Sequence, residues 1–290
     1  MSNEWNDLLE EMEKDVSGGP KKYWQPPSDK EGTFRIRILP PLKSKGEKKF
    51  YFVHKVHWID GTPYECLDQT LVDKNGKLHE AEPCPVCRLS KQLFKTASRG
   101  TPDWKLASSL APNTRYIYRI VVRGKDDETQ PEFYQSGKTI FNIIYHIIKE
   151  TDYGVIIDPK NGRDFDLTKT GIGRQSKYDQ SLPAANPSPI FSDPQKMKKL
   201  LENAEKMDYN SLIEFLSYDD LKKILDESLG FAENNENPKR STEDNEVNKI
   251  SENDENPKRT VLEKEVSKNT EENDSLSEDE ELDKILAEFG

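Results

Sequence analysis

The stretch TRYIYRIVVR, residues 114–123, predicts the central strand of the fold. Side chains alternate between the two faces of a strand, so one face would carry apolar and aromatic residues and the other would carry arginines. The first set is Tyr116, Tyr118, Ile120 and Val122, and the second is Arg115, Arg119 and Arg123. The stretch TFRIRILPP, residues 33–41, repeats this alternation with Arg35 and Arg37. We therefore expect two half-buried strands that present their arginines to solvent.

Further short strands and helices surround these two. Strand-like segments occur at residues 48–58, 132–136 and 153–158, and they are separated by turn signals at Asp60-Gly61, Asn75-Gly76 and Asn161-Gly162. Residues 137–150 have isoleucines at helical spacing, and a helical texture begins at Ser192, with Pro194 in the first turn. Many short strands with glycine turns are typical of a small barrel or sandwich. The expected class is α+β, mainly β.

Charge is distributed unevenly along the 290 residues, of which 33% are hydrophobic and 33% charged. Residues 231–290 hold 19 acidic and 8 basic residues, a balance of −11 that equals the net charge of the whole chain. Residues 31–125 hold 18 basic and 9 acidic residues. This pattern predicts an amphipathic arm and linker at 1–32, a folded core at 33–230 and a disordered acidic tail at 231–290.

Three cysteines cannot all pair, and no apolar run is long enough to cross a bilayer. A reducing cytoplasm is therefore the expected setting, without a membrane partner. We instead expect the cysteines to bind a metal ion.

Two of the three cysteines lie in HEAEPCPVCRLSK, residues 79–91, and with Cys66 and one histidine they would make a closed Cys₃His zinc site. If Asp60-Gly61 forms a two-residue hairpin turn, His57 lies opposite Tyr64 and on the same face as Cys66. His54 would point away, and His79 remains the second choice. The predicted ligands are His57, Cys66, Cys84 and Cys87, with a structural rather than a catalytic zinc.

Catalytic interpretations are weaker. A zinc deaminase needs H-x-E well upstream of P-C-x-x-C, whereas His79 is followed directly by Glu80. SGKT at residues 136–139 ends like a phosphate-binding loop, but Glu132 stands where that loop begins with glycine. We expect a protein that is not an enzyme. The main alternative function is a zinc-ribbon module that binds protein, such as a transcription or scaffold factor.

Cationic and aromatic residues interleave in the middle of the chain, as a binder of single-stranded nucleic acid requires. Tyr178 lies in the polar stretch GRQSKYDQS and is expected to be an exposed ring, whereas Tyr116 and Tyr118 have equal chances of lying in the core. The predicted DNA-binding residues are Arg35, Arg37, Arg115, Tyr116, Arg119, Tyr134, Lys138 and Tyr178.

Several motifs occur in the order found in one known family. They are FRIRILP, HWIDGTPYEC, CPVC, YIYRIVV, YQSGKTI, GRQSKYDQS and the terminal SEDEELDKILAEF. In these motifs the chain resembles the single-stranded DNA-binding, or helix-destabilising, proteins of T-even bacteriophages. The resemblance implies an OB-fold core with an inserted zinc subdomain at about 54–95, a DNA cleft between them, and work in phage DNA replication, recombination and repair in the infected bacterial cytoplasm. The same four zinc ligands match by position, as do Arg37, Tyr116, Tyr134, Lys138 and Tyr178 in the cleft.

The two ends of the chain carry apolar residues on acidic backgrounds. Near the C-terminal end an apolar stripe, Leu282, Ile285, Leu286 and Phe289, is expected to recruit phage replication and recombination proteins. The family begins with a basic segment, whereas residues 5–16 of this chain are acidic. Self-association along DNA would then use apolar contacts through Trp5 and Leu8.

Overall fold

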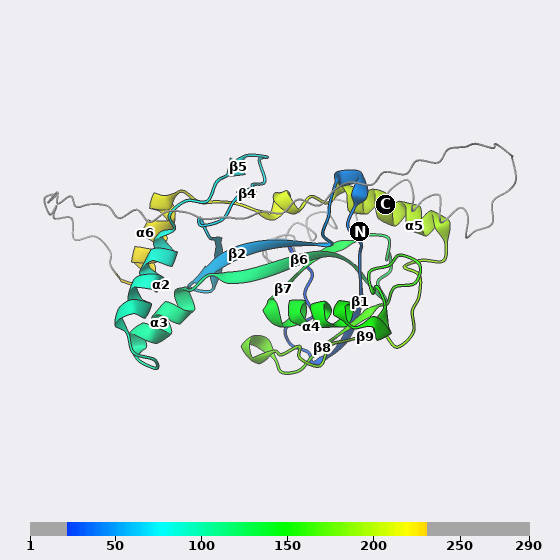
Figure 1. Cartoon of the computed structure of the whole chain (residues 1–290), viewed down its shortest axis with the longest axis horizontal. Helices are drawn as coiled ribbons and strands as arrows, with labels where there is room; N and C mark the ends of the chain where they lie inside the picture. The colour runs from blue at the N-terminus through cyan, green and yellow to red at the C-terminus, as the bar shows by residue number, and fades with distance from the viewer. Residues whose placement is uncertain (1–21, 231–290) are drawn as a thin grey trace, which may run out of the picture.

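A computed structural model describes residues 22–230, and the arm before them and the tail after them, including Leu282, Ile285, Leu286 and Phe289, lie outside the described residues. The described part is α+β, with a mainly antiparallel sheet and five α-helices (Figure 1). The strands of the main sheet are β1 (Gly32–Ile38), β2 (Tyr51–Ile59), β3 (Thr62–Glu65), β6 (Asn113–Val122), β7 (Glu132–Ser136), β8 (Phe165–Lys169) and β9 (Leu182–Pro183). A separate pair is formed by β4 (Leu71–Val72) and β5 (Leu78–His79). The helices are α2 (Pro85–Thr96), α3 (Pro102–Leu110), α4 (Lys138–Lys149), α5 (Pro194–Lys206) and α6 (Tyr218–Ser228).

The strand β6 organises the sheet. Tyr118 pairs with Tyr51 of β2 on one side and with Tyr134 of β7 on the other. Two residues further on, Ile120 pairs with Ile38 of β1 and again with β7. The strands β2 and β1 therefore follow one another along the same edge of β6, so that one long strand joins two parts of the molecule.

The first face of β6 is apolar, as its alternation predicts. Tyr118 and Ile120 are buried in a core cluster with three isoleucines of α4, which packs across this face. Those isoleucines are Ile140, Ile144 and Ile147. This confirms the helical pattern seen in residues 137–150 and assigns Tyr118 to the core.

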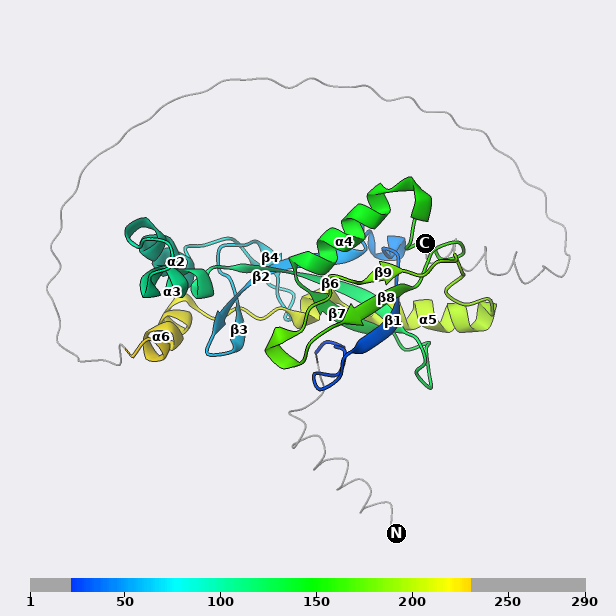
Figure 2. The same cartoon turned by 90° about the horizontal axis from the view of Figure 1, so that it is seen from below.

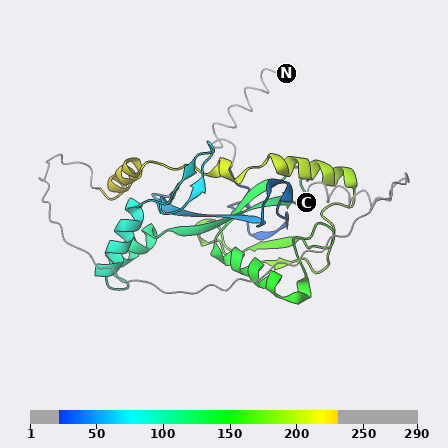
Figure 3. The same ribbon diagram turned by 45° about the horizontal axis from the view of Figure 1, so that its top comes forward.

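The second face of β6 is also covered, which the sequence pattern does not show. Val121 packs with Met197 and Leu200 of α5, and Ile117 packs with Tyr209 of the 3-10 helix η4 (Tyr209–Leu212). Figures 1 and 3 show α4 and α5 on opposite faces of the sheet. Because both faces are covered, the prediction that the arginines of β1 and β6 point to solvent is wrong for most of them.

Arg119 lies buried beneath η4 rather than in solvent. Its guanidinium donates two hydrogen bonds of 2.8 Å to the carboxylate of Glu47 and one of 2.9 Å to the carbonyl of Met207. It also lies 4.1 Å from the centroid of the Tyr209 ring. A buried charge requires such compensation, and here the partners come from segments distant in sequence.

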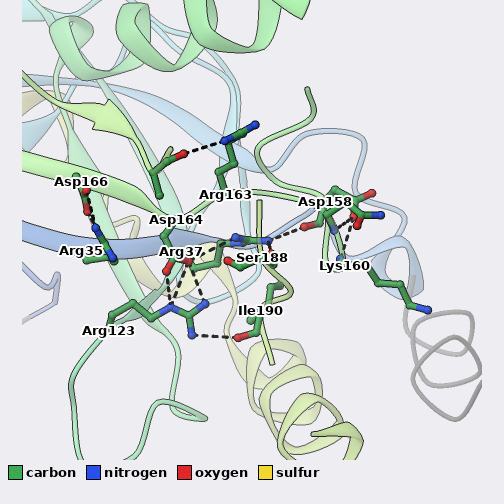
Figure 4. A network of polar contacts seen from close by, with 12 residues as sticks. Arg35, Arg37, Arg123, Asp158, Lys160, Arg163, Asp164, Asp166, Ser188 and Ile190 are labelled. Atoms are coloured by element: carbon green, nitrogen blue, oxygen red, sulfur yellow. Dashed lines mark hydrogen bonds and ion pairs between the residues drawn. The ribbon is translucent and has the colours of Figure 1, made fainter. Parts of the chain in front are cut away.

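Arg37 is fully buried in a polar network beside β8 (Figure 4). Its Nη2 donates hydrogen bonds of 2.8 Å to the carbonyls of Asp158 and Ser188, and its Nη1 lies 3.4 Å from the Asp164 carboxylate. Asp164 also accepts hydrogen bonds from Arg123, which directly follows β6. These arginines hold loops against the sheet and have few N–H groups left for other partners.

Arg35 is exposed to solvent, unlike Arg37 and Arg119. Its side chain is 55% exposed and makes a two-point ion pair with Asp166, with distances of 2.7 and 2.9 Å. The expectation of a solvent-facing arginine is correct at this position.

The strand expected at residues 153–158 is also wrong. The chain forms the 3-10 helix η2 (Thr151–Tyr153) and then a turn in which the Asp158 carboxylate accepts hydrogen bonds from the backbone N–H groups of Lys160 and Asn161. Aspartate favours such local turns over strands. The strand that pairs with β1 is β8, which follows this turn.

A metal lobe forms around the far end of β2 (Figure 2). We use this name for the cluster in which the three cysteines pack with Ile59, Leu67 and Leu110 and with residues of α6. The helices α2 and α3 pack on each other, and α6 packs on α2, so the lobe draws on segments well beyond the CPVC motif. None of the helices within residues 22–230 is long and apolar enough to cross a membrane.

Gly162 provides a test of the buried network around Arg37. A Cβ at this position would lie 2.3 Å from the carbonyl oxygen of Asp158 and 2.6 Å from Arg37 Nη2. We expect Gly162→Ala to lower the free energy of unfolding by about 2–4 kcal/mol, because the network must shift. Urea denaturation would measure this change.

The matched control is Gly154→Ala. This glycine has a φ of +65° but open space around its Cβ position, so only backbone strain of about 1 kcal/mol is expected. Equal losses for the two variants would show that the close approach at Gly162 does not constrain the fold.

Candidate metal centre and nucleic-acid interface

Four buried side chains, His57, Cys66, Cys84 and Cys87, converge in the metal lobe, and their ligand atoms all lie within 4.8 Å of one another. His57 Nε2 lies 3.4 Å from the Sγ atoms of both Cys84 and Cys87, and the Sγ atoms of Cys66 and Cys87 are 3.5 Å apart. In a tetrahedral Zn–Cys₃His site, ligand atoms lie roughly 3.3–3.8 Å apart. The group therefore fits one tetrahedral metal ion.

The surroundings of the four ligands support this assignment. His57 Nδ1 donates a hydrogen bond of 2.8 Å to the carbonyl of Leu110, which leaves Nε2 directed at the cysteines. Such a contact fixes the orientation of a metal-binding imidazole. Cys84 is the N-cap of α2, where backbone N–H groups favour a thiolate. Hydrogen bonds from Cys66 and Cys87 lower the pKa of the Cys84 thiol.

The register of the β2–β3 hairpin is the one predicted. Asp60 and Gly61 have φ values of 49° and 81°, and His57 pairs with Tyr64. The other candidate, His79, donates from Nε2 to the carbonyl of Leu67 and stacks on Phe215 with ring centroids 3.8 Å apart. It therefore does not belong to the cluster.

A surface depression of about 480 Å³ lies between α4 and the segment around Tyr178. It brings together three of the predicted DNA-binding residues, Arg115, Tyr134 and Tyr178, although they come from β6, β7 and a loop. Lys138 is exposed at the first position of α4, between two residues that line the depression. Arg35, Arg37 and Arg119 do not line it.

The N-terminus of α4 opens onto this depression. Its N-cap is Gly137, and no side chain caps the free N–H groups of the first turn. A Cβ at Gly137 would lie 3.2 Å from Arg115 Nη1, so the guanidinium lies beside the helix end. A helix N-terminus with free N–H groups attracts anions. The SGK motif thus places these N–H groups at a strand-to-helix turn, which is a candidate anion site although it lacks a complete phosphate-binding loop.

Arg115 is half-buried and only partly paired. Its guanidinium lies 5.5 Å from the centroid of the Trp58 ring, and its buried Nε has no hydrogen-bond partner within the described residues. Burial lowers the pKa of Arg115. A charged group that is desolvated in this way gains more from an incoming anion than a fully hydrated one does.

The predicted aromatic residues differ in accessibility. Tyr134 is 3% exposed and makes an edge-on contact with Trp24, with centroids 5.9 Å apart. Tyr116 stacks in parallel on Phe141 at 3.8 Å. Tyr178 is half-buried against the first core cluster, whereas an exposed ring was expected, and burial raises its pKa. The prediction failed because the apolar residues that contact Tyr178 lie far from it in the sequence.

Sequence reasoning missed Trp24 and Gln25. Residues 18–32 read as a linker, yet the N–H of Trp24 donates a hydrogen bond of 2.7 Å to the carbonyl of Phe133, so this segment adds to the edge of β7. Gln25 lines the depression. In the sequence, only the large aromatic side chain of Trp24, close to prolines, indicates that this segment packs on the folded core.

Metal removal tests the assignment of the four ligands. We expect His57→Ala to bind less than one metal ion per chain and to melt at a lower temperature, because a structural site adds its binding free energy to folding. Its control, His79→Ala, should retain the metal and lose only the hydrogen bond to Leu67 and the ring contact with Phe215. Elemental analysis and thermal unfolding with and without a chelator would measure both effects. Full metal content in His57→Ala would rule out this ligand set.

Comparison with known proteins agrees with this geometry. A search for relatives among curated proteins finds no match. The family model described as gp32 DNA binding protein like matches residues 30–231, which is more than half of the chain. The matched region includes the four residues of the metal cluster, the uncapped end of α4 and, except for Gln25, the residues that line the depression beside it. The chain therefore belongs to the gp32-like family of DNA-binding proteins.

Proposed function

We propose that this protein binds single-stranded DNA without sequence preference and coats it. The observation that carries the proposal is the convergence of Arg115 and the free N-terminus of α4 on a depression whose wall includes Tyr178. Lys138 is exposed at the same end of α4. Cations and helix N–H groups would hold phosphates, and rings would accept unstacked bases. We further propose that the sheet and α4 form an OB-type core.

A single strand fits this site better than a duplex. Tyr178 lies beside the cationic groups, and a ring can stack only on a base that is not already stacked within a helix. The depression contains amide and hydroxyl groups, such as those of Gln25 and Thr139, but no row of arginines that could read base edges in a groove. This favours binding through the backbone and the ring faces over sequence-specific recognition.

We infer that zinc is the metal of the Cys₃His group and that its role is structural. Four protein ligands leave no open coordination position for water, and thiolates with imidazole suit zinc. His57 and Trp58 are consecutive on β2, and Arg115 lies over the Trp58 ring. The metal would thus stabilise the part of β2 that supports a phosphate contact.

The cellular role is proposed from the family and the sequence. The protein would protect single strands during phage DNA replication, recombination and repair in the cytoplasm of an infected bacterium, without catalysis. Its stripe at Leu282, Ile285, Leu286 and Phe289 would bind replication and recombination proteins, and contacts through Trp5 and Leu8 would join neighbouring copies. The alternative function is that of a zinc module that binds only protein. It does not explain why cationic groups lie beside the free N-terminus of α4.

Salt dependence of oligothymidylate binding tests the phosphate contacts. We expect Arg115→Met and Lys138→Met each to weaken binding and to reduce the slope of log K against log salt by about 1, because each variant removes one counterion-releasing contact. The control Lys198→Met removes an exposed lysine from α5, on the opposite face of the sheet. A slope that falls equally in all three variants would point to diffuse charge rather than to this site.

Base stacking is tested separately at Tyr178. We expect Tyr178→Leu to weaken binding by about 1–3 kcal/mol and to leave the salt slope unchanged, because it removes a ring but no charge. Tyr178→Phe, which keeps the ring, should bind nearly as the wild type does. If the leucine variant bound poly(dT) normally, the ring would have no part in the interface.

A further inference from the structure

The segment that precedes β1 connects the two walls of the depression at α4. We call this segment, residues 22–31, the strap. Its first half is attached to β7, which forms one wall. The N–H of Trp24 donates a hydrogen bond of 2.7 Å to the carbonyl of Phe133, and Gln25 Nε2 donates one of 3.0 Å to the carbonyl of Gln135.

The second half of the strap is attached to the other wall, which is the loop between β8 and β9 that carries Tyr178. The carbonyl of Ser28 accepts a hydrogen bond of 3.1 Å from the N–H of Gly173. The carboxylate of Glu31 accepts a hydrogen bond from the N–H of Gly171. The strap therefore spans the distance from one wall to the other.

Two consecutive prolines, Pro26 and Pro27, limit how the middle of the strap can be held. A proline has no backbone N–H, so this part of the strap cannot donate hydrogen bonds to a neighbouring strand. Its carbonyl groups are the backbone groups that remain for attachment, and they need donors from elsewhere in the molecule. The strap thus depends on a donor group of the folded core.

Lys169, the last residue of β8, supplies these donors. Its side chain is 2% exposed, and its Nζ donates hydrogen bonds to the carbonyls of Pro27 and Ser28. An ammonium group has three N–H donors, so one lysine can hold two carbonyls at once. A lysine is rarely buried unless its charge is compensated. Because β8 leads directly into the loop of Tyr178, Lys169 ties the strap to the strand that carries this loop.

We propose that Lys169 is a positioning residue for DNA binding, an inference that rests on the proposed function. Through the strap, Lys169 fixes the place of Tyr178 relative to β7 and to the N-terminus of α4. It does this without contacting the DNA, because its side chain is buried. A ring and an anion site that are already in place lose less conformational freedom when a strand binds.

Lys169→Met in the full-length, zinc-loaded chain tests this role, because the variant keeps an apolar stem but loses the donors. We expect faster hydrogen exchange at the amides of Gly171 and Gly173, measured by NMR. Affinity for oligothymidylate should fall about tenfold, the factor that one charge-assisted hydrogen bond contributes. The slope of log K against log salt should keep its wild-type value, because a buried ammonium releases no counterion. The control Lys30→Met removes an exposed lysine of the strap and should leave both exchange rates unchanged.

Glu31 provides a second test at an exposed position, where a substitution does not disturb the core. If only overall charge mattered, removing this carboxylate would strengthen DNA binding, because it repels phosphates. The strap predicts the opposite result. Glu31→Ala should weaken binding about threefold, because the N–H of Gly171 loses its partner and the loop is released. Glu31→Gln keeps an oxygen acceptor and should bind at least as tightly as the wild type.

Different results would overturn this inference and the proposed function. Wild-type affinity in both Lys169→Met and Glu31→Ala would overturn the positioning role and leave the proposed function intact. A salt slope reduced by about 1 in Lys169→Met, with wild-type exchange rates, would make Lys169 a direct phosphate contact and would also overturn the positioning role. If Lys169→Met did not fold, tighter binding by Glu31→Ala would overturn it alone. A wild-type chain that did not bind oligothymidylate would contradict the proposed function, and the positioning role with it.

Discussion

The carboxylate of Asp164 links an arginine of β1 to the arginine that directly follows the neighbouring strand β6, and the arrangement of the sheet depends on this link. Arg37 of β1 and Arg123 both donate to it, and Arg37 also donates to the carbonyls of Asp158 and Ser188 (Figure 4). Removing one partner from such a buried pair costs about 3–5 kcal/mol, because the other charge is left without compensation. The loops that precede β8 and α5 are thereby tied to the sheet.

The candidate metal centre lies at the other end of the molecule. β2 provides His57 to the cluster and pairs with β6 along six residue pairs. Because β2 and β6 run from the lobe into the main sheet, the lobe and the proposed anion site at α4 share one continuous framework. A site held in place before its ligand arrives loses less conformational entropy on binding.

Much of this could be predicted from the sequence where the relevant constraint is local. Alternation in residues 114–123 identified the face of β6 that packs on α4, and the Asp60-Gly61 turn identified His57 as the imidazole opposite Tyr64. Both inferences depend only on the twofold period of a strand and on one turn. The four members of the candidate metal centre follow from them and from the CPVC spacing.

Other features depend on partners that are distant in sequence. Alternation places Arg37 and Arg119 on the face of the sheet opposite to the apolar residues of their strands. It cannot show that α5 and η4 cover that face, or that Glu47 and Asp164 supply the counter-charges. The strand β8 was missed because its pairing with β1 is long-range, and the turn at Asp158 was mistaken for a strand. Trp24 likewise becomes part of the sheet edge only through a contact with Phe133.

The position of Trp58 has an optical consequence. Its indole lies under the guanidinium of Arg115 and follows His57 directly in the chain. Indole emission responds to nearby charge and to local rigidity, so this one chromophore is placed to sense both an ion held by the neighbouring imidazole and an anion that draws Arg115 away. The protein therefore contains its own spectroscopic probe between its two candidate sites.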